Sequence, residues 1–209
     1  MRDADFFRQW MAVAADAVER EADRLTELDS PIGDADHGSN LLRGFTAVRA
    51  DLEADPPASP GASLQRAGRT LISTVGGASG PLYGTLLRRT GKELGEAAEV
   101  SDDELRKALY AGVGAVAQLG GAAPGDKTML DALVPGVAAL NTSYRAAAEA
   151  AWDGARATVP MTARKGRASY LGERSAGHQD PGATSAALLL GALAETADAA
   201  DAEASGAGA

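Results

Sequence analysis

The sequence contains no cysteine. Disulfide bonds, thiolate metal sites and cysteine nucleophiles are therefore excluded. Aromatic residues are scarce, at 4% of the chain, and the residue types that favour strands are too scattered to form strand-length runs. Alanine, leucine, arginine and glutamate are abundant instead, and this composition predicts a helical protein.

Positive charge is in deficit, because 20 Lys and Arg against 29 Asp and Glu leave a net charge of -9. This charge argues against a nucleic-acid binder, which would show a basic face. It does not argue against phosphate ligands, because metal ions or a local cluster of positive charge can bind them. No apolar run reaches the roughly 18 residues of a membrane span, and the N-terminus lacks the layout of a signal peptide. We therefore expect a cytoplasmic protein that contacts no membrane.

Hydrophobic residues recur at helical spacing along most of the chain, as in Phe6, Phe7, Trp10 and Met11. The Ser-x-x-Glu pattern of "SDDEL" is typical of a capping box at a helix start, and Pro81 suits the first position of another helix. We expect an all-α protein of about eight helices. Residues 1–196 are expected to form one domain, and residues 197–209, rich in Ala and acidic residues, a disordered tail.

Four of the expected connections carry clusters of glycine, charge or hydroxyl groups: 29–40, 76–84, 120–129 and 164–184. If the helices alternate up and down, every second connection falls at the same end of the bundle. Loops on a rigid helical scaffold are where binding groups usually lie. Several of these segments are therefore expected to meet in space.

The first of these connections contains three carboxylates, Asp29, Asp34 and Asp36. Oxygen ligands of this kind suit a hard cation such as Mg²⁺ or Ca²⁺. The EF-hand pattern does not fit, because Gly38 and Phe45 stand where ligands are required. Three aspartates can hold two Mg²⁺ ions that complete their shells with water and phosphate. The alternative is that the aspartates merely cap a helix N-terminus.

Two further connections are rich in glycine. "GGASGPLYG" precedes a helix and offers backbone N–H groups and the Ser79 hydroxyl to an anion; the alternative is a helix C-cap followed by a tight turn. "GGAAPGDKT" is not a Walker A motif, because Asp126 stands where the lysine is required and no strand is predicted before it. Lys127 and Thr128 remain candidates for contact with phosphate.

The fourth connection contains the most basic stretch of this acidic chain, with Arg164, Lys165, Arg167 and Arg174. Arginine side chains fork onto phosphate oxygens, although such a stretch can also be a solvated basic turn. The chain has two histidines, each a candidate general base, ligand or structural residue. No G-x-S-x-G signature of a serine hydrolase is present.

Together these segments supply what a metal–nucleotide site requires: carboxylates for cations, backbone amides and arginine for phosphates. Phosphoryl transfer depends on positioning and charge neutralisation, so it needs no side-chain nucleophile. The residues alone therefore make a Mg-nucleotide site a hypothesis that stands beside the capping, tight-turn and solvated-turn alternatives.

The segments "GDADHG", "GGASGPLYGT", "PGDKTM" and "ARKGRASYLGERSAGHQDPGATS" resemble, in the same order, the nucleotide-binding L (DhaL) subunits of dihydroxyacetone kinase. The resemblance covers the chain from about Asp29 to Ser185. It implies an antiparallel barrel of eight helices with ADP or ATP bound between the loops at one end.

The resemblance also implies the site residues, and no catalytic residue beyond the ligands of metal and phosphate. Asp29, Asp34 and Asp36 match the aspartates that hold two Mg²⁺ in this family. The nucleotide contacts fall on His37, Gly38, Ser39, Asn40, Ala78, Ser79, Gly120, Met129, Arg167, Asp180, Pro181 and Gly182.

Partners follow from the same resemblance. Family L subunits transfer the phosphoryl group to dihydroxyacetone held on a K subunit, and a phosphohistidine-carrying M subunit of a phosphoenolpyruvate-dependent system rephosphorylates the ADP in place. Some L subunits also bind a transcriptional regulator. The alternatives are an ATP-dependent kinase subunit for a related triose or tetrose, a module that signals nucleotide state to a regulator, and a dimetal hydrolase with a metal-activated water.

Overall fold

Eight α-helices and one 3₁₀ helix account for most of residues 1–206, the part of the chain that the computed structural model describes. They are α1 (Ala4–Asp29), α2 (His37–Ala54), α3 (Pro60–Thr74), α4 (Ser79–Leu94), α5 (Asp102–Gly120), α6 (Leu130–Ala139), α7 (Tyr144–Ala157), the 3₁₀ helix η1 (Arg167–Ser175) and α8 (Pro181–Gly206). The predicted all-α class is confirmed. An antiparallel ribbon of β1 (Arg2–Asp3) and β2 (Glu99–Val100) was not expected, because two-residue strands leave no pattern in a sequence.

Serine side chains fix the start of several helices. The capping box at Ser101 is confirmed: its hydroxyl accepts from the Glu104 N–H, and the Glu104 carboxylate accepts from the Ser101 N–H. The hydroxyl groups of Ser59 and Ser143 accept from the N–H groups of Ala62 and Ala146 and so cap α3 and α7, without the reciprocal carboxylate bond. The sequence predicted Pro81 at the first position of a helix, but it lies at the third position of α4. The position tolerates proline because the first four N–H groups of a helix have no partner within it.

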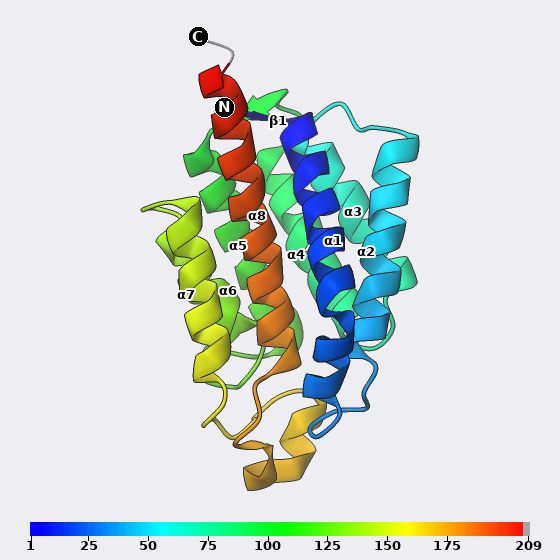
Figure 1. The fold of residues 1–209 in the computed structure, drawn as a ribbon, viewed down its shortest axis with the longest axis vertical. Helices are drawn as coiled ribbons and strands as arrows, with labels where there is room; N and C mark the ends of the chain where they lie inside the picture. Colours follow the sequence, from blue (N-terminus) through cyan, green and yellow to red (C-terminus); the bar gives the residue numbers. More distant parts are fainter. Residues whose placement is uncertain (207–209) are drawn as a thin grey trace.

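The helices form a closed ring, in which each packs against the next along the chain and α8 packs against α1 (Figure 1). The core includes Phe7, Trp10, Phe45 and Tyr83, each at most 2% exposed. The Trp10 indole N–H donates to the Leu189 carbonyl at 2.9 Å and so joins α1 to α8. This closed ring is the antiparallel barrel that the family resemblance implied.

The alternation of helix direction brings the four unusual connections to one end of the barrel. α1, α3, α5 and α7 end there, whereas α2, α4, α6 and α8 begin there, and Figure 1 shows the connecting segments and η1 gathered at the end far from both termini. The expectation that alternate connections meet in space is thereby confirmed.

The C-terminal segment differs from the sequence prediction as far as the structure describes it. Residues 197–206, predicted to be disordered, continue α8 to Gly206. Arg2, 8% exposed, binds Asp201 on this segment at 2.7 Å and Asp102 on α5 at 3.0 Å. Residues 207–209 of the predicted tail lie outside the described residues. None of the described helices has the length and apolar character needed to cross a membrane.

Candidate nucleotide and metal site

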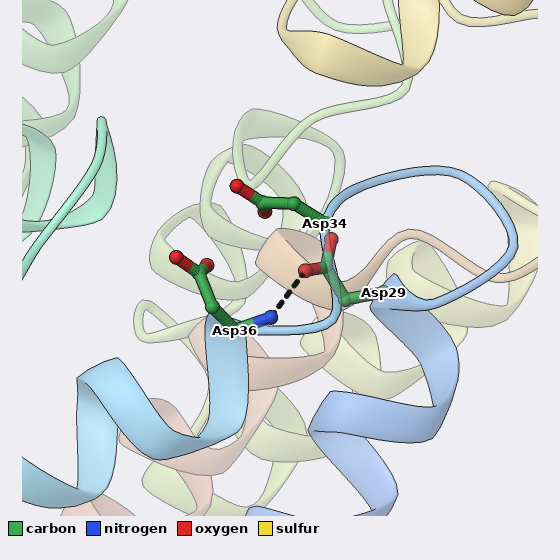
Figure 2. Close-up of side chains that lie close together, drawn as sticks. All are labelled: Asp29, Asp34 and Asp36. Atoms are coloured by element: carbon green, nitrogen blue, oxygen red, sulfur yellow. Dashed lines mark hydrogen bonds between the residues drawn. The ribbon is translucent and has the colours of Figure 1, made fainter.

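The three aspartates meet where α1 passes into α2. Asp29 is the last residue of α1, and Asp36 immediately precedes α2. One carboxylate oxygen of each, Asp34 included, lies within 4.8 Å of the other two (Figure 2). The Oδ2 atom of Asp29 accepts from the backbone N–H of Asp36 at 3.1 Å and of His37 at 3.4 Å. These bonds hold the loop against the carboxylate and do not involve Oδ1.

Two small residues shape this loop. At Gly33 a Cβ would lie 1.9 Å from Asp29 Oδ1, so a side chain there would collide with the carboxylate. Ala35 adopts a left-handed backbone with φ of 60°, between the two aspartates that follow Gly33. A non-glycine residue pays about 1–2 kcal/mol for that conformation. Strain of this kind is concentrated at functional sites, where the surroundings hold it in place.

Two adjoining cavities open at this end of the barrel. The first, called here the apolar cavity, has a volume of about 390 Å³ and is lined by residues of all four connections, with Pro81, Leu82, Val116, Leu119, Ala122, Met129 and Leu130 forming its apolar wall. The second, the polar cavity, contains the three aspartates together with Gly76, Gly77, Arg164, Ser169 and Tyr170. Asp29, His37, Ala78, Ser79, Lys165, Gly166 and Arg167 border both. The arrangement fits a ligand with an apolar body and a charged end that binds cations.

Helix dipoles add to this preference for an anion. α2, α4 and α8 begin at His37, Ser79 and Pro181, all of which line the apolar cavity. The N-terminus of a helix carries a partial positive charge and free N–H groups. Three such ends directed at one site favour phosphate.

Hydroxyl and imidazole groups from three helices form a continuous chain of hydrogen bonds at the site. Ser79 Oγ lies 3.2 Å from His37 Nδ1, and Ser185 Oγ lies 2.9 Å from His37 Nε2. The Tyr83 hydroxyl lies 2.6 Å from Ser185 Oγ. Burial lowers the pKa of His37, although Asp29, Asp36 and the Pro181 carbonyl act in the opposite direction. The ring is therefore neutral at physiological pH.

The sequence made Lys127 a candidate for phosphate contact, and the structure shows its ammonium group engaged with the backbone instead. Its ammonium group is buried and donates to the backbone carbonyls of Thr158, Met161 and His178. Burial lowers the pKa of Lys127. The lysine therefore fixes the chain between α7 and α8, and the carbonyl of His178 is one of its anchors.

Asp180 is a buried carboxylate in the wall of the apolar cavity. Its Oδ2 atom accepts from the Ala183 N–H at 2.7 Å and so caps α8. Burial raises its pKa to about 7, although the Ala183 N–H and Lys127 act in the opposite direction. The carboxyl group therefore changes charge close to physiological pH.

The structure brings together most of the predicted site residues. All three aspartates border the polar cavity, and the apolar cavity is lined by His37, Ala78, Ser79, Gly120, Met129, Arg167, Asp180, Pro181 and Gly182.

Three predicted nucleotide contacts, Gly38, Ser39 and Asn40, line neither cavity. Gly38 packs against α1, where a Cβ would lie 1.9 Å from the Ala22 carbonyl oxygen. Ser39 donates to the Asp36 carbonyl, and the Asn40 side chain accepts from Arg43.

Apart from Met129 and Ser79, the apolar wall and the hydrogen-bond network of His37 escaped sequence reasoning. Leu119 is 54% exposed at the end of α5, beside a glycine-rich connection. An apolar residue at the mouth of a polar loop is a signal that could have located this wall. Tyr83 and Ser185 lie within the quoted motifs but at helical positions that predict burial, so nothing in the sequence pairs them with His37.

Comparison with known proteins gives a consistent result. The family model described as the DAK2 domain matches residues 31–195. The chain is 44% identical over 195 residues to the PEP-dependent dihydroxyacetone kinase, ADP-binding subunit DhaL, of Escherichia coli K12, covering 88% of this chain and 93% of that protein. It is 41% identical to the ADP-binding subunit DhaL of PEP-dependent dihydroxyacetone kinase 2 of Listeria innocua, over 92% of this chain and 94% of that one.

A solved structure is also similar. The dihydroxyacetone kinase from C. freundii in complex with AMP-PNP and Mg²⁺ superposes with a TM-score of 0.73 at 28% identity. The match covers 92% of this chain but only 33% of that kinase. The chain thus spans about a third of the C. freundii protein and nearly the whole length of the two bacterial subunits.

Proposed function

The chain belongs to the DAK2 domain family, and from this premise we propose that it is the ADP-binding subunit of a dihydroxyacetone kinase, a phosphotransferase. The observation that carries the proposal is the pair of adjoining cavities. An apolar cavity suited to a nucleoside and a polar cavity with three carboxylates share the border at which a diphosphate would lie. Residues 1–196 are the proposed nucleotide-binding domain, which the family match to residue 195 supports.

The donor set of the polar cavity fits magnesium. Carboxylate oxygens are the ligands that Mg²⁺ prefers, and it binds through few of them together with phosphates. Asp29, Asp34 and Asp36 would hold the metal, with two ions as the proposed number. When bound, Mg²⁺ neutralises phosphate charge and so favours phosphoryl transfer.

The remaining residues of the proposed site bind and orient the nucleotide. Leu82, Leu119 and Met129 offer apolar surface to the base. The N-termini of α2, α4 and α8 and the Arg167 guanidinium lie on the side where the phosphates would bind. Within this proposal Gly38, Ser39 and Asn40 contribute backbone at the start of α2, since their side chains make other contacts.

The molecule that accepts the phosphoryl group is proposed to lie on a partner subunit. The names of the bacterial relatives describe subunits of PEP-dependent kinases, which supports a complex of several chains. In the proposed complex a K subunit holds dihydroxyacetone, and a phosphohistidine-carrying M subunit returns the phosphoryl group to bound ADP. The alternative, in which free ATP exchanges at the site, is supported by the C. freundii kinase, whose longer chain was solved with AMP-PNP.

The test is to denature the purified chain and identify any released nucleotide by chromatography. Stoichiometric ADP supports a resident cofactor and the PEP-dependent subunit. An empty chain that binds Mg-ATP reversibly supports the ATP-dependent alternative, and an empty chain without nucleotide affinity overturns the proposal.

A second assay separates the kinase subunit from a binding module. The chain is combined with a K subunit, an M subunit, phosphoenolpyruvate-dependent phosphotransferase components and dihydroxyacetone, and formation of the phosphorylated triose is measured. Turnover supports the kinase subunit. Bound nucleotide without turnover in any combination identifies a module that reports nucleotide state, for which a transcriptional regulator is the proposed partner.

A further inference from the structure

Two buried hydroxyl groups, outside the residues assigned above, lie directly behind the His37 ring. Ser185 is 3% exposed and Tyr83 is 1% exposed, and they come from different helices, α8 and α4. Ser185 Oγ contacts Nε2 of His37 directly, and the Tyr83 hydroxyl reaches the ring only through Ser185; this imidazole borders both the apolar and the polar cavity. Buried polar networks that are fully satisfied fix a single arrangement of their members.

The Gly182 carbonyl lies within reach of both hydroxyl groups, and the shorter of the two contacts sets one arrangement of the hydrogen atoms. Ser185 Oγ donates to the Gly182 carbonyl at 3.1 Å, which uses its one proton. Tyr83 can then donate to Ser185 Oγ across the 2.6 Å contact. In this arrangement Nε2 of His37, 2.9 Å from the same oxygen, carries the ring proton and donates it to Ser185.

The other ring nitrogen follows. A neutral imidazole with its proton on Nε2 has a free lone pair on Nδ1. Ser79 Oγ, 3.2 Å from Nδ1 and at the border of the two cavities, then donates to Nδ1 and keeps its own lone pairs for other partners. Ser79 therefore offers that border an acceptor, suited to a donor such as a cation-bound water.

We propose that Tyr83 and Ser185 are positioning residues, which hold His37 as the Nε2–H tautomer and through it fix the Ser79 hydroxyl at the border of the two cavities. Ser185 lines neither cavity, whereas Tyr83 lines the apolar cavity with its hydroxyl 2.6 Å from Ser185 Oγ; the proposed role of both residues runs through His37. The tautomer of His37 does not depend on the proposed function. The expected consequence, tighter binding of the Mg-nucleotide, rests on that proposed function.

The first test needs neither nucleotide nor metal. Long-range ¹H–¹⁵N correlation spectra of the labelled chain report the ring tautomer, at a pH where both imidazoles are neutral. The chain has only two histidines, so the H178Q variant assigns the signals of His37. The expected result is one Nε2–H tautomer for His37 in the wild-type chain and a mixture in S185A and Y83F. An Nδ1–H ring in the wild type, or unchanged spectra in both variants, would overturn the proposal.

The second test measures the affinity for Mg-ADP by calorimetry. S185A and Y83F should each weaken it about 3- to 10-fold, as expected from the loss of one hydrogen bond. The matched controls S63A and Y144F remove hydroxyl groups of α3 and α7 that line neither cavity, and should leave the affinity unchanged. Altered tautomers with wild-type affinity would overturn the positioning role. Absence of Mg-ADP binding in the wild type would overturn the proposed function and leave the tautomer result standing.

Discussion

Arg167 Nη2 lies 2.8 Å from Asp34 Oδ2, so the basic segment of η1 and the acidic loop before α2 form a direct ion pair. The two residues are 133 positions apart in the sequence. They meet because α1 and α7, which precede them, end at the same face of the barrel. The pair places a guanidinium beside a proposed metal ligand. Arg167 is thereby held where it can contact phosphates as well.

Replacing Arg167 with alanine should weaken nucleotide binding about 10- to 100-fold, the loss expected for a hydrogen bond to a charged group. The free energy of unfolding should change by less than about 1 kcal/mol, because the guanidinium is 64% exposed. Calorimetric titration with Mg-ADP and chemical denaturation measure the two effects. R174A, on the same segment but lining neither cavity, is the control. A collapse of stability without nucleotide would show that Arg167 is structural.

Replacing Asp34 or Asp36 with asparagine should abolish Mg²⁺-dependent retention of nucleotide. Asparagine keeps the size of the side chain and removes the charge that a hard cation requires. Magnesium titration and the nucleotide content of the purified variants provide the measurement. D23N, at an exposed position of α1, should behave as the wild type. Unchanged nucleotide content in D34N and D36N would refute the metal assignment.

Replacing Gly33 with alanine should damage the metal site through Asp29. The new Cβ would lie 1.9 Å from Asp29 Oδ1, so the carboxylate must move away from the other two aspartates. Magnesium affinity should fall, and the overpacked loop should lose about 1–3 kcal/mol of stability. Gly114 of α5 is the control, since a Cβ there meets nothing within 4 Å, and G114A should gain up to about 1 kcal/mol. Wild-type magnesium affinity in G33A would contradict the assignment of Asp29.

Local patterns predicted the helices and the four site segments because their causes lie within a few residues. The Ser101 capping box and the apolar spacing of α1 need no partner elsewhere in the chain. The order of the quoted motifs also predicted the family, and strict alternation of the helices placed the segments at one end.

What the sequence did not predict depends on contacts between distant segments. Lys127 follows a glycine-rich stretch of the kind that binds phosphate, yet its ammonium group donates to backbone carbonyls 31 to 51 residues away in the sequence. Residues 197–206 are polar and rich in alanine, but Arg2 at the opposite end of the chain binds Asp201 on this part of α8. Both contacts join segments far apart in the sequence, which a local pattern does not pair.

Asp180 provides a prediction on pH. Burial raises its pKa to about 7, from 3.8 in the unfolded chain. At a pH between these two pKa values the chain takes up a proton at Asp180 when it folds. The buried carboxyl group therefore contributes least to stability when it is charged. The sign follows: stability contributed at Asp180 is fully present below about pH 4 and is lost as the pH rises through 7. From pH 5 to 8 the loss should amount to about 2–3 kcal/mol.

D180N isolates this effect, because asparagine stays neutral and its carbonyl oxygen can still accept from the Ala183 N–H. Urea denaturation of both chains at several pH values, with a chelator and without nucleotide, gives the difference in unfolding free energy. All other titrating groups cancel in that difference, so it should move in favour of D180N by about 2–3 kcal/mol between pH 5 and 8. A difference that is constant over this range would contradict a pKa of Asp180 near 7.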